Sequence, residues 1–197
     1  MKRKSTALYG GTFNPPHLGH FEALSAISQL YYQVIVMPSG TPPHKPLPDG
    51  SANPEQRLEM ARLMAEGLEN VEISDFEIRK DGASYTVDTL EWLTRRHPRI
   101  TLVVGADMLF TLPQWKDFGR IARLADFAAV CRSKEQRTAV EAAAQTLGAE
   151  VIEHEPVDIS STRLRELLAR SQGREWLRES VWEFIKENGL YGFGAAD

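Results

Sequence analysis

Two histidines follow a glycine pair and two prolines near the start of the chain. Glycines permit a tight turn, and His17 and His20 lie three residues apart, hence on one face of a helix. The backbone N–H groups and the dipole at a helix start favour an anion, and imidazoles donate further hydrogen bonds to phosphate oxygens. The spacing therefore predicts a phosphate site, although either histidine taken alone is more often a surface or core residue. The residues in order are Gly10, Gly11, Thr12, Phe13, Asn14, Pro15, Pro16, His17, Leu18, Gly19 and His20.

Gly19 adds to this prediction. A glycine inside a helix costs about 1 kcal/mol relative to alanine. We therefore expect something to approach the backbone closely at Gly19.

The elements that must position these residues alternate between strands and helices. Apolar runs predict strands at residues 6–9, 34–37, 100–104, 127–131 and 150–153, and period-two alternation adds strands at 71–74 and 76–79. Helices are expected over 18–30, 54–66, 85–96 and 138–147, with short ones near Met108 and Phe118 and two more after residue 160. Asn53 and Ser84 are the expected N-caps of two of them.

This alternation predicts an α/β fold with a doubly wound, mostly parallel sheet flanked by helices. Ligands of such sheets bind beyond the carboxyl ends of the strands. We expect one domain over residues 1–197, with the C-terminal helices from about residue 160 packed on it.

Two more segments combine basic residues with loops or helix starts. His44 and Lys45 lie on a proline-stiffened loop that suits mobile phosphates, although a solvated loop is the simpler alternative. Ile159, Ser160, Ser161 and Thr162 open a late helix whose free N–H groups could hold a phosphate beside Arg163, although capping alone explains the hydroxyls. Arg165 cannot share the helical face of Arg163, so we expect it on the surface.

Two remaining segments follow a glycine loop or a buried strand. Ser84, Tyr85 and Thr86 form either an ordinary capped helix or a helix start whose free N–H groups favour an anion. Asp107 could accept hydrogen bonds from a ribose, and Trp115 could stack on a cationic ring or pack in the core. Trp92, Trp176 and Trp182 are expected to be packing residues.

Composition narrows the class of partner. The 197 residues carry a net charge of −4, which disfavours broad nucleic-acid binding and leaves room for a local phosphate pocket. The single Cys131 cannot form an internal disulfide and is expected on a buried strand. No segment has the length of a membrane span or the core of a signal peptide. We therefore expect a cytoplasmic protein with a small-molecule partner.

Together these segments resemble the HxGH nucleotidyltransferases and, among them, the bacterial nicotinate-nucleotide adenylyltransferases. His17-Leu18-Gly19-His20 matches the HxGH signature and Gly10-Gly11-Thr12-Phe13 its lead-in. Other matches are the PPHK loop ending at Lys45, the SYTxxTL segment from Ser84, the GxD and LPxW segments at Asp107 and Trp115, and the ISSTxxR segment from Ile159. Of the two arginines in this last segment, Arg163 and Arg165, we expect Arg163 to be the functional one.

The resemblance implies a Rossmann-like nucleotidyltransferase fold. It also implies transfer of AMP from ATP to nicotinate mononucleotide in NAD biosynthesis, with pyrophosphate as the second product. Mg²⁺ would bind through the ATP phosphates, and the protein would have no metal site of its own. Two alternative functions stay open: a related adenylyltransferase that acts on nicotinamide mononucleotide or phosphopantetheine, and a non-catalytic nucleotide-binding regulator. The resemblance does not specify the oligomeric state.

The resemblance also assigns residues. Catalytic roles fall to His17, His20, His44, Lys45 and Arg163. ATP contacts fall to Gly10, Gly11, Thr12, Phe13, His17, His20, Gly105, Asp107, Ile159, Ser160, Ser161, Thr162 and Arg163. Nicotinate mononucleotide contacts fall to Gly11, Thr12, Ser39, Gly40, His44, Lys45, Ser84, Tyr85, Thr86, Asp107 and Trp115. The chain departs from the pattern at Asn14, where many relatives carry Asp, and at Gly40, where some carry an amide side chain.

Overall fold

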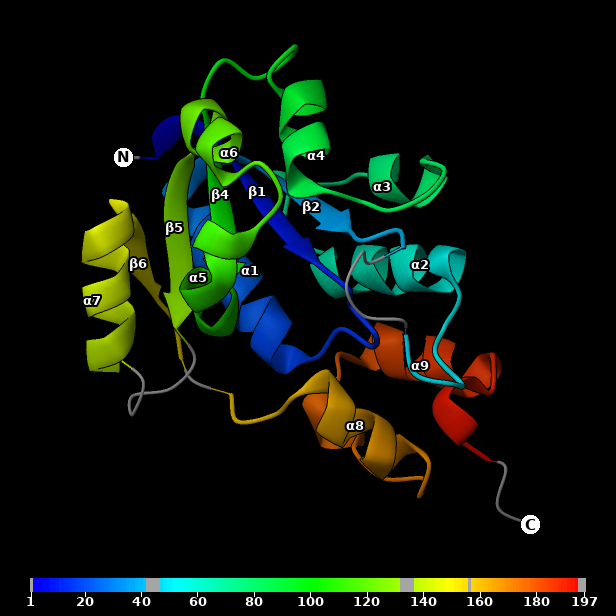
Figure 1. The fold of residues 1–197 in the computed structure, drawn as a ribbon. Helices are drawn as coiled ribbons and strands as arrows, with labels where there is room; N and C mark the ends of the chain where they lie inside the picture. Colours follow the sequence, from blue (N-terminus) through cyan, green and yellow to red (C-terminus); the bar gives the residue numbers. More distant parts are fainter. Residues whose placement is uncertain (1, 42–46, 132–136, 156, 195–197) are drawn as a thin grey trace.

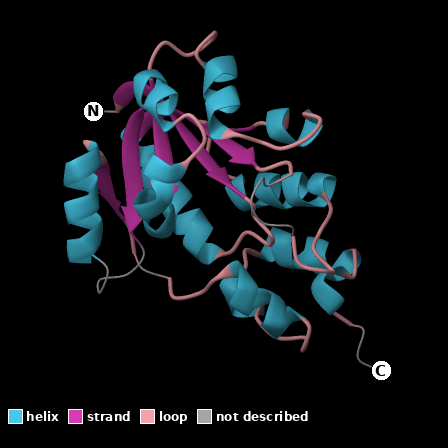
Figure 2. Cartoon of the chain, viewed as in Figure 1, coloured by secondary structure: helices cyan, strands magenta, loops and turns pink. Residues whose placement is uncertain are grey.

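The computed structural model describes residues 2–41, 47–131, 137–155 and 157–194, and its centre is a parallel sheet (Figures 1 and 2). Its six strands stand in the order β3-β2-β1-β4-β5-β6. The order reverses at β1, so β1 and β4 form the switch point of a doubly wound sheet. The strands are β1 (Arg3–Gly11), β2 (Tyr31–Pro38), β3 (Val71–Ile73), β4 (Ile100–Gly105), β5 (Asp126–Cys131) and β6 (Glu150–Glu153).

Helices cover both faces of the sheet, which is why residues 7–9 of β1 and 102–104 of β4 are all apolar and buried. Alternate strand residues serve opposite faces: Ala7 packs in one core cluster and Leu8 in the other. The first cluster includes α1 (Leu18–Leu30), α2 (Pro54–Ala65), α8 (Ser161–Leu168) and α9 (Glu179–Glu187). The second includes α4 (Thr86–Leu93), α5 (Ala106–Thr111), α6 (Phe118–Leu124) and α7 (Arg137–Leu147).

Local signals fixed several element boundaries as predicted. The helix over residues 18–30 and the strand over 150–153 have the predicted bounds. Asn53 caps α2 in a reciprocal pair, in which Gln56 N–H donates to Asn53 Oδ1 at 2.8 Å and Asn53 N–H donates to Gln56 Oε1 at 2.9 Å. Such a cap contributes about 1 kcal/mol and satisfies donors that the first helical turn leaves open.

Two local predictions are wrong. Residues 76–79 form a helical turn, α3 (Phe76–Arg79), and not a strand. The apolar and polar alternation misleads there because the polar Glu77 is buried at 9% exposure. Ser84 does not cap the next helix, because Tyr85 occupies the N-cap position and the Ser84 hydroxyl donates to the Glu77 carbonyl at 3.4 Å.

Two further residues differ from expectation. Cys131, expected to be buried, is half-buried at the end of β5. Arg165, expected on the surface, is half-buried and its guanidinium donates to the Asn14 carbonyl at 2.7 Å. A long side chain at a helix start can fold back on the preceding loop, which the spacing of residues around a helix does not take into account.

Of the tryptophans predicted to be packing residues, Trp182 is buried, and the ring of Trp92 stacks on that of Phe76 with the centroids 4.2 Å apart.

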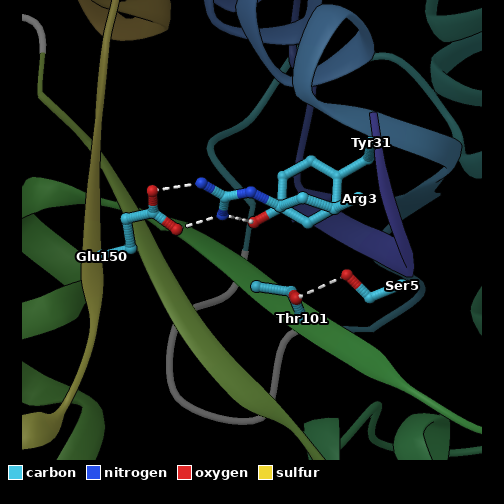
Figure 3. Close-up of polar contacts among 5 residues, drawn as sticks. All are labelled: Arg3, Ser5, Tyr31, Thr101 and Glu150. Atoms are coloured by element: carbon cyan, nitrogen blue, oxygen red, sulfur yellow. Dashed lines mark hydrogen bonds and ion pairs between the residues drawn. The ribbon is translucent and has the colours of Figure 1, made fainter. Parts of the chain in front are cut away.

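Polar contacts tie the strands at the amino end of the sheet (Figure 3). The Arg3 guanidinium bonds both carboxylate oxygens of Glu150 and donates to the Tyr31 hydroxyl at 3.1 Å. Arg3, Tyr31 and Glu150 are the first residues of β1, β2 and β6, respectively. The carboxyl end of the sheet is left for the loops that carry the predicted site residues.

Within the described ranges, no helix is long and apolar enough to cross a membrane.

Candidate active site

A cavity of about 800 Å³ opens at the carboxyl ends of the central strands. Its walls come from the segments after β1, β2 and β4 and from the start of α4. Parallel strands bring their carboxyl ends to one edge, so residues far apart in sequence meet there. The predicted site residues that line it are Gly10, Gly11, Thr12, His17, His20, Ser39, Ser84, Tyr85, Thr86, Gly105, Asp107 and Trp115.

The two histidines lie at the start of α1. His17 is the N-cap residue and is buried, and its backbone N–H donates to His20 Nδ1 at 3.2 Å. The ring centroids of the pair are 3.8 Å apart. Because Nδ1 of His20 accepts a hydrogen bond, its ring proton sits on Nε2 in the neutral form, where it can donate to an anion.

Gly19 makes room for this pair. A Cβ at Gly19 would lie 3.0 Å from His17 Nδ1 and 3.6 Å from Val157 Cβ. The predicted close approach to the backbone therefore exists, and the approaching group is the imidazole of His17. A larger residue would push that ring from its position on the cavity wall.

The start of α4 forms the opposite part of the wall. Tyr85 and Thr86 line the cavity, and Lys116 Nζ lies 4.0 Å from the centroid of the Tyr85 ring. A cation over a tyrosine face is worth about 0.5–1 kcal/mol at an exposed site. The arrangement adds a positive charge to a helix start that already favours anions.

Glu77 also lines the cavity, and its only signal in the sequence was a place in an alternating pattern that was wrongly interpreted as a strand. Thr89 Oγ1 donates to Glu77 Oε1 at 2.6 Å. Burial raises the pKa of Glu77, and hydrogen bonds from Thr89 and Ser84 partly offset that effect. A carboxyl group therefore sits beneath the residues expected to meet the acceptor.

The third part of the wall follows β4. Gly105 is the N-cap residue of α5, and Asp107 lies in the first turn of that helix. Trp115 packs partly against the core cluster and also lines the cavity, so its two alternative roles are compatible. Sequence reasoning missed several lining residues because nothing in their local pattern marks them: Met108, Thr111, Gln114, Lys116 and His154.

Some predicted site residues lie away from this wall. Phe13 is 1% exposed and packs in the core, with its ring centroid 5.2 Å from that of His20. Its side chain supports His20 from the core and does not line the cavity. Gly40 is buried just behind the wall, where a Cβ would lie 2.1 Å from the Glu77 carbonyl oxygen. That contact explains why an amide side chain has no space there.

The start of α8 is likewise outside the cavity lining. Ser160 caps this helix, since Arg163 N–H donates to its hydroxyl at 3.2 Å, and Ser161 Oγ donates to the Pro15 carbonyl at 2.9 Å. The Arg163 side chain is 57% exposed and pairs with Glu166 at 2.9 Å. Ile159 is buried and Thr162 is exposed. His44 and Lys45 lie outside the described residues.

Asn14 has a structural role. Its Oδ1 accepts from the Tyr191 hydroxyl at 2.9 Å and from Ala52 N–H at 3.3 Å, while its Nδ2 donates to Ser51 Oγ at 2.8 Å. The amide therefore ties the histidine segment to the loop before α2 and to the C-terminal end of the chain.

Comparison with known proteins fits this geometry. Residues 8–167 match the model of the cytidylyltransferase-like family. The chain belongs to this family. Two members named "Probable nicotinate-nucleotide adenylyltransferase" align over 97% of the chain and 98% of their own length. The one from Oceanobacillus iheyensis is 32% identical, and the one from Synechococcus sp. is 35% identical.

The family fold is also found among solved structures. The nicotinic acid mononucleotide adenylyltransferase of Plasmodium falciparum, solved with NaAD, superposes with a TM-score of 0.82. The superposition covers 98% of this chain and 100% of the other, at 18% identity. This cytidylyltransferase-like chain therefore has the nucleotidyltransferase variant of the Rossmann-like fold that its sequence predicted.

No group of three or more possible metal-ligating His, Cys, Asp or Glu side chains occurs in the part of the chain that the structure describes.

Proposed function

We propose that this chain transfers AMP from ATP to nicotinate mononucleotide, giving nicotinate adenine dinucleotide and pyrophosphate in NAD biosynthesis. The observation that carries the proposal is one cavity whose lining includes the histidine pair, the start of α4 at Tyr85 and Thr86, and Trp115. The near full-length similarity to nicotinate-nucleotide adenylyltransferases supports the same reaction.

The chemistry needs little beyond positioning. The attacking group is a phosphate oxygen of the mononucleotide, whose second pKa near about 6 leaves it ionised at neutral pH, so no general base is required. Its oxygen forms a bond to the α-phosphorus of ATP as the bond to the bridging oxygen breaks, and that electron pair leaves with pyrophosphate. The protein aligns two polyanions and stabilises the charge that develops.

The histidine pair suits the phosphates of ATP. Nε2 of His20 carries the ring proton in the neutral tautomer, because Nδ1 accepts from the His17 backbone N–H. Gly10 lines the cavity at the end of β1, and the absence of a side chain there allows a ligand to approach the backbone; at Gly11 the same space is taken by the Phe13 ring, 2.9 Å from where a Cβ would lie. We assign His17 and His20 to these phosphates.

The start of α4 suits the acceptor. Backbone donors at Tyr85 and Thr86 and the nearby Lys116 ammonium favour a carboxylate over a neutral carboxamide. The indole of Trp115 offers a face to the cationic pyridine ring, and Asp107 can accept from a ribose hydroxyl. This wall therefore supports nicotinate mononucleotide as the substrate.

Further assignments rest on the family resemblance. We propose that His44 and Lys45 hold the leaving pyrophosphate, and that Arg163 with the amides of Ser160, Ser161 and Thr162 holds the triphosphate. Arg163 would have to leave Glu166, at the modest cost of breaking an exposed ion pair. Mg²⁺ would bind through ATP oxygens. The core cluster that runs from β1 to α9 supports one domain over the whole chain.

The test is pyrophosphate release from ATP and Mg²⁺ with three acceptors in parallel: nicotinate mononucleotide, nicotinamide mononucleotide and phosphopantetheine. We expect release with the first at a far higher kcat/KM than with the others. Preference for another acceptor would overturn the substrate assignment. ATP binding without release for any acceptor would overturn the assignment as an enzyme.

A further inference from the structure

Arg57 is a fully buried arginine directly behind the phosphate end of the cavity. It lies on α2 and is 0% exposed. Its Nη1 donates to the carbonyl of Thr12 at 2.9 Å and to that of Ser39 at 2.7 Å, and its Nη2 donates to the carbonyl of Gly40 at 3.2 Å. One guanidinium therefore joins the segment after β1 to the segment after β2.

The charge of Arg57 is compensated in an uncommon way. Within the ranges that the structure describes, no carboxylate forms an ion pair with it, and its Nε has no hydrogen-bond partner. Burial lowers the pKa of Arg57, as expected for a cation taken out of water. Buried charges are ordinarily paired with an opposite charge, so three carbonyl dipoles leave this one incompletely neutralised.

The bonded carbonyls belong to the cavity wall. Thr12 and Ser39 both line the cavity, and a backbone bond from Ser39 N–H to the Gly11 carbonyl at 2.9 Å holds the two segments together. In a trans peptide the N–H points opposite to the carbonyl. With its carbonyl held by Arg57, the peptide after Thr12 therefore turns its N–H away from the guanidinium.

We propose that Arg57 is a positioning residue for the adenylyl-transfer site, one that sets the two segments at the phosphate end and supplies positive charge behind them. This inference rests on the proposed function. The guanidinium touches no reacting atom: it acts through the backbone of Thr12 and Ser39 and through its field, which the low-dielectric interior screens little.

Two substitutions separate geometry and charge from packing. R57M keeps the length and the apolar stem but removes the donors and the charge. R57K keeps the charge and one donor group but loses the planar fork. Arg62, on the same helix and with a side chain 49% exposed in an ion pair to Glu59, supplies the matched control R62M.

The experiment measures kcat and KM for both substrates at a temperature well below each variant's melting transition, together with the dissociation constant of Mg-ATP by calorimetry. For folded R57M we expect kcat/KM to fall by about 10²-fold, with weaker Mg-ATP binding. R57K should recover Mg-ATP affinity to within about threefold of wild type while keeping a lowered kcat. R62M should match wild type.

A purely structural role would lower the melting temperature of R57M and leave the kinetics of the folded protein near wild type, which would overturn the proposal. Equal loss of Mg-ATP affinity in R57K and R57M would overturn the part played by charge. If R57M fails to fold, R57K alone tests the proposal, because an unchanged kcat in R57K would contradict the positioning role of Arg57. Failure of the proposed function would show instead as no pyrophosphate release by the wild type, and the Mg-ATP affinities of the variants would still test Arg57.

Discussion

A single methyl group added at Gly40 should damage both stability and acceptor binding. Its Cβ would lie 2.1 Å from the Glu77 carbonyl oxygen and 2.8 Å from Ser84 Oγ. The nearer atom is backbone, so Gly40 itself must move. Overpacking ordinarily lowers the free energy of unfolding by about 1–3 kcal/mol, and we expect an overlap with the main chain to cost about 3 kcal/mol. At roughly 2–4 °C per kcal/mol for a chain of this size, the melting temperature should fall by roughly 6–12 °C.

The same movement should weaken the wall that faces the acceptor. Ser84 N–H donates to the Thr41 carbonyl at 3.0 Å, which ties the segment after β2 to the start of α4. Displacing Gly40 pulls on this bond and shifts Tyr85 and Thr86. We therefore expect G40A to raise KM for nicotinate mononucleotide more than KM for ATP.

Thermal unfolding followed by circular dichroism and steady-state pyrophosphate release measure the two effects. The matched control is G119A, on α6, where the nearest atom to the added Cβ is Arg123 Nη1 at 3.8 Å. Alanine is favoured over glycine in a helix by roughly 0.5–1 kcal/mol, so G119A should melt at or above the wild-type temperature. A G40A variant that melts within about 2 °C of wild type with an unchanged KM would contradict the steric conflict expected at Gly40.

Three further changes test other parts of the structure. Burial raises the pKa of Glu77 above its usual 4.5, so the folded state holds a proton that the unfolded chain has lost, and this group lowers stability as pH rises through that window. Urea unfolding from about pH 5 to about pH 8 should show a steeper loss for wild type than for E77Q; parallel curves would contradict the buried carboxyl. H20A should lose about 10²–10³-fold in kcat/KM with an unchanged circular dichroism spectrum. The control H97A should keep its activity, because His97 lies at the amino end of the sheet, with its Nδ1 3.1 Å from Thr6 Oγ1. N53A should lose about 1 kcal/mol of unfolding free energy in a denaturant titration and leave both KM values unchanged, and an unaltered midpoint would remove the significance of the cap.

Much of the fold could be predicted because its signals are local. The buried strand at residues 100–105 is apolar except for Thr101, and Asn53, Pro54 and Gln56 specify a helix start with their own side chains and backbone. The turn at Phe76–Arg79 could not be predicted in the same way. Its burial pattern depends on Thr89, which donates to Glu77 from another helix, and no window around Glu77 contains that partner.

The site divides along the same line. The glycine turn and the two histidines after a first strand could be predicted, because residue type and short spacing carry that information. The same holds for the places of Tyr85, Thr86, Asp107 and Trp115 after later turns. The folded chain was needed to show that these groups share one cavity, that Phe13 supports His20 from the core, and that Arg163 lies outside the lining. Arg57 and Gly40 have no local signal at all. Their importance comes from contacts across the chain, which exist only once parallel strands bring distant loops to the same edge of the sheet.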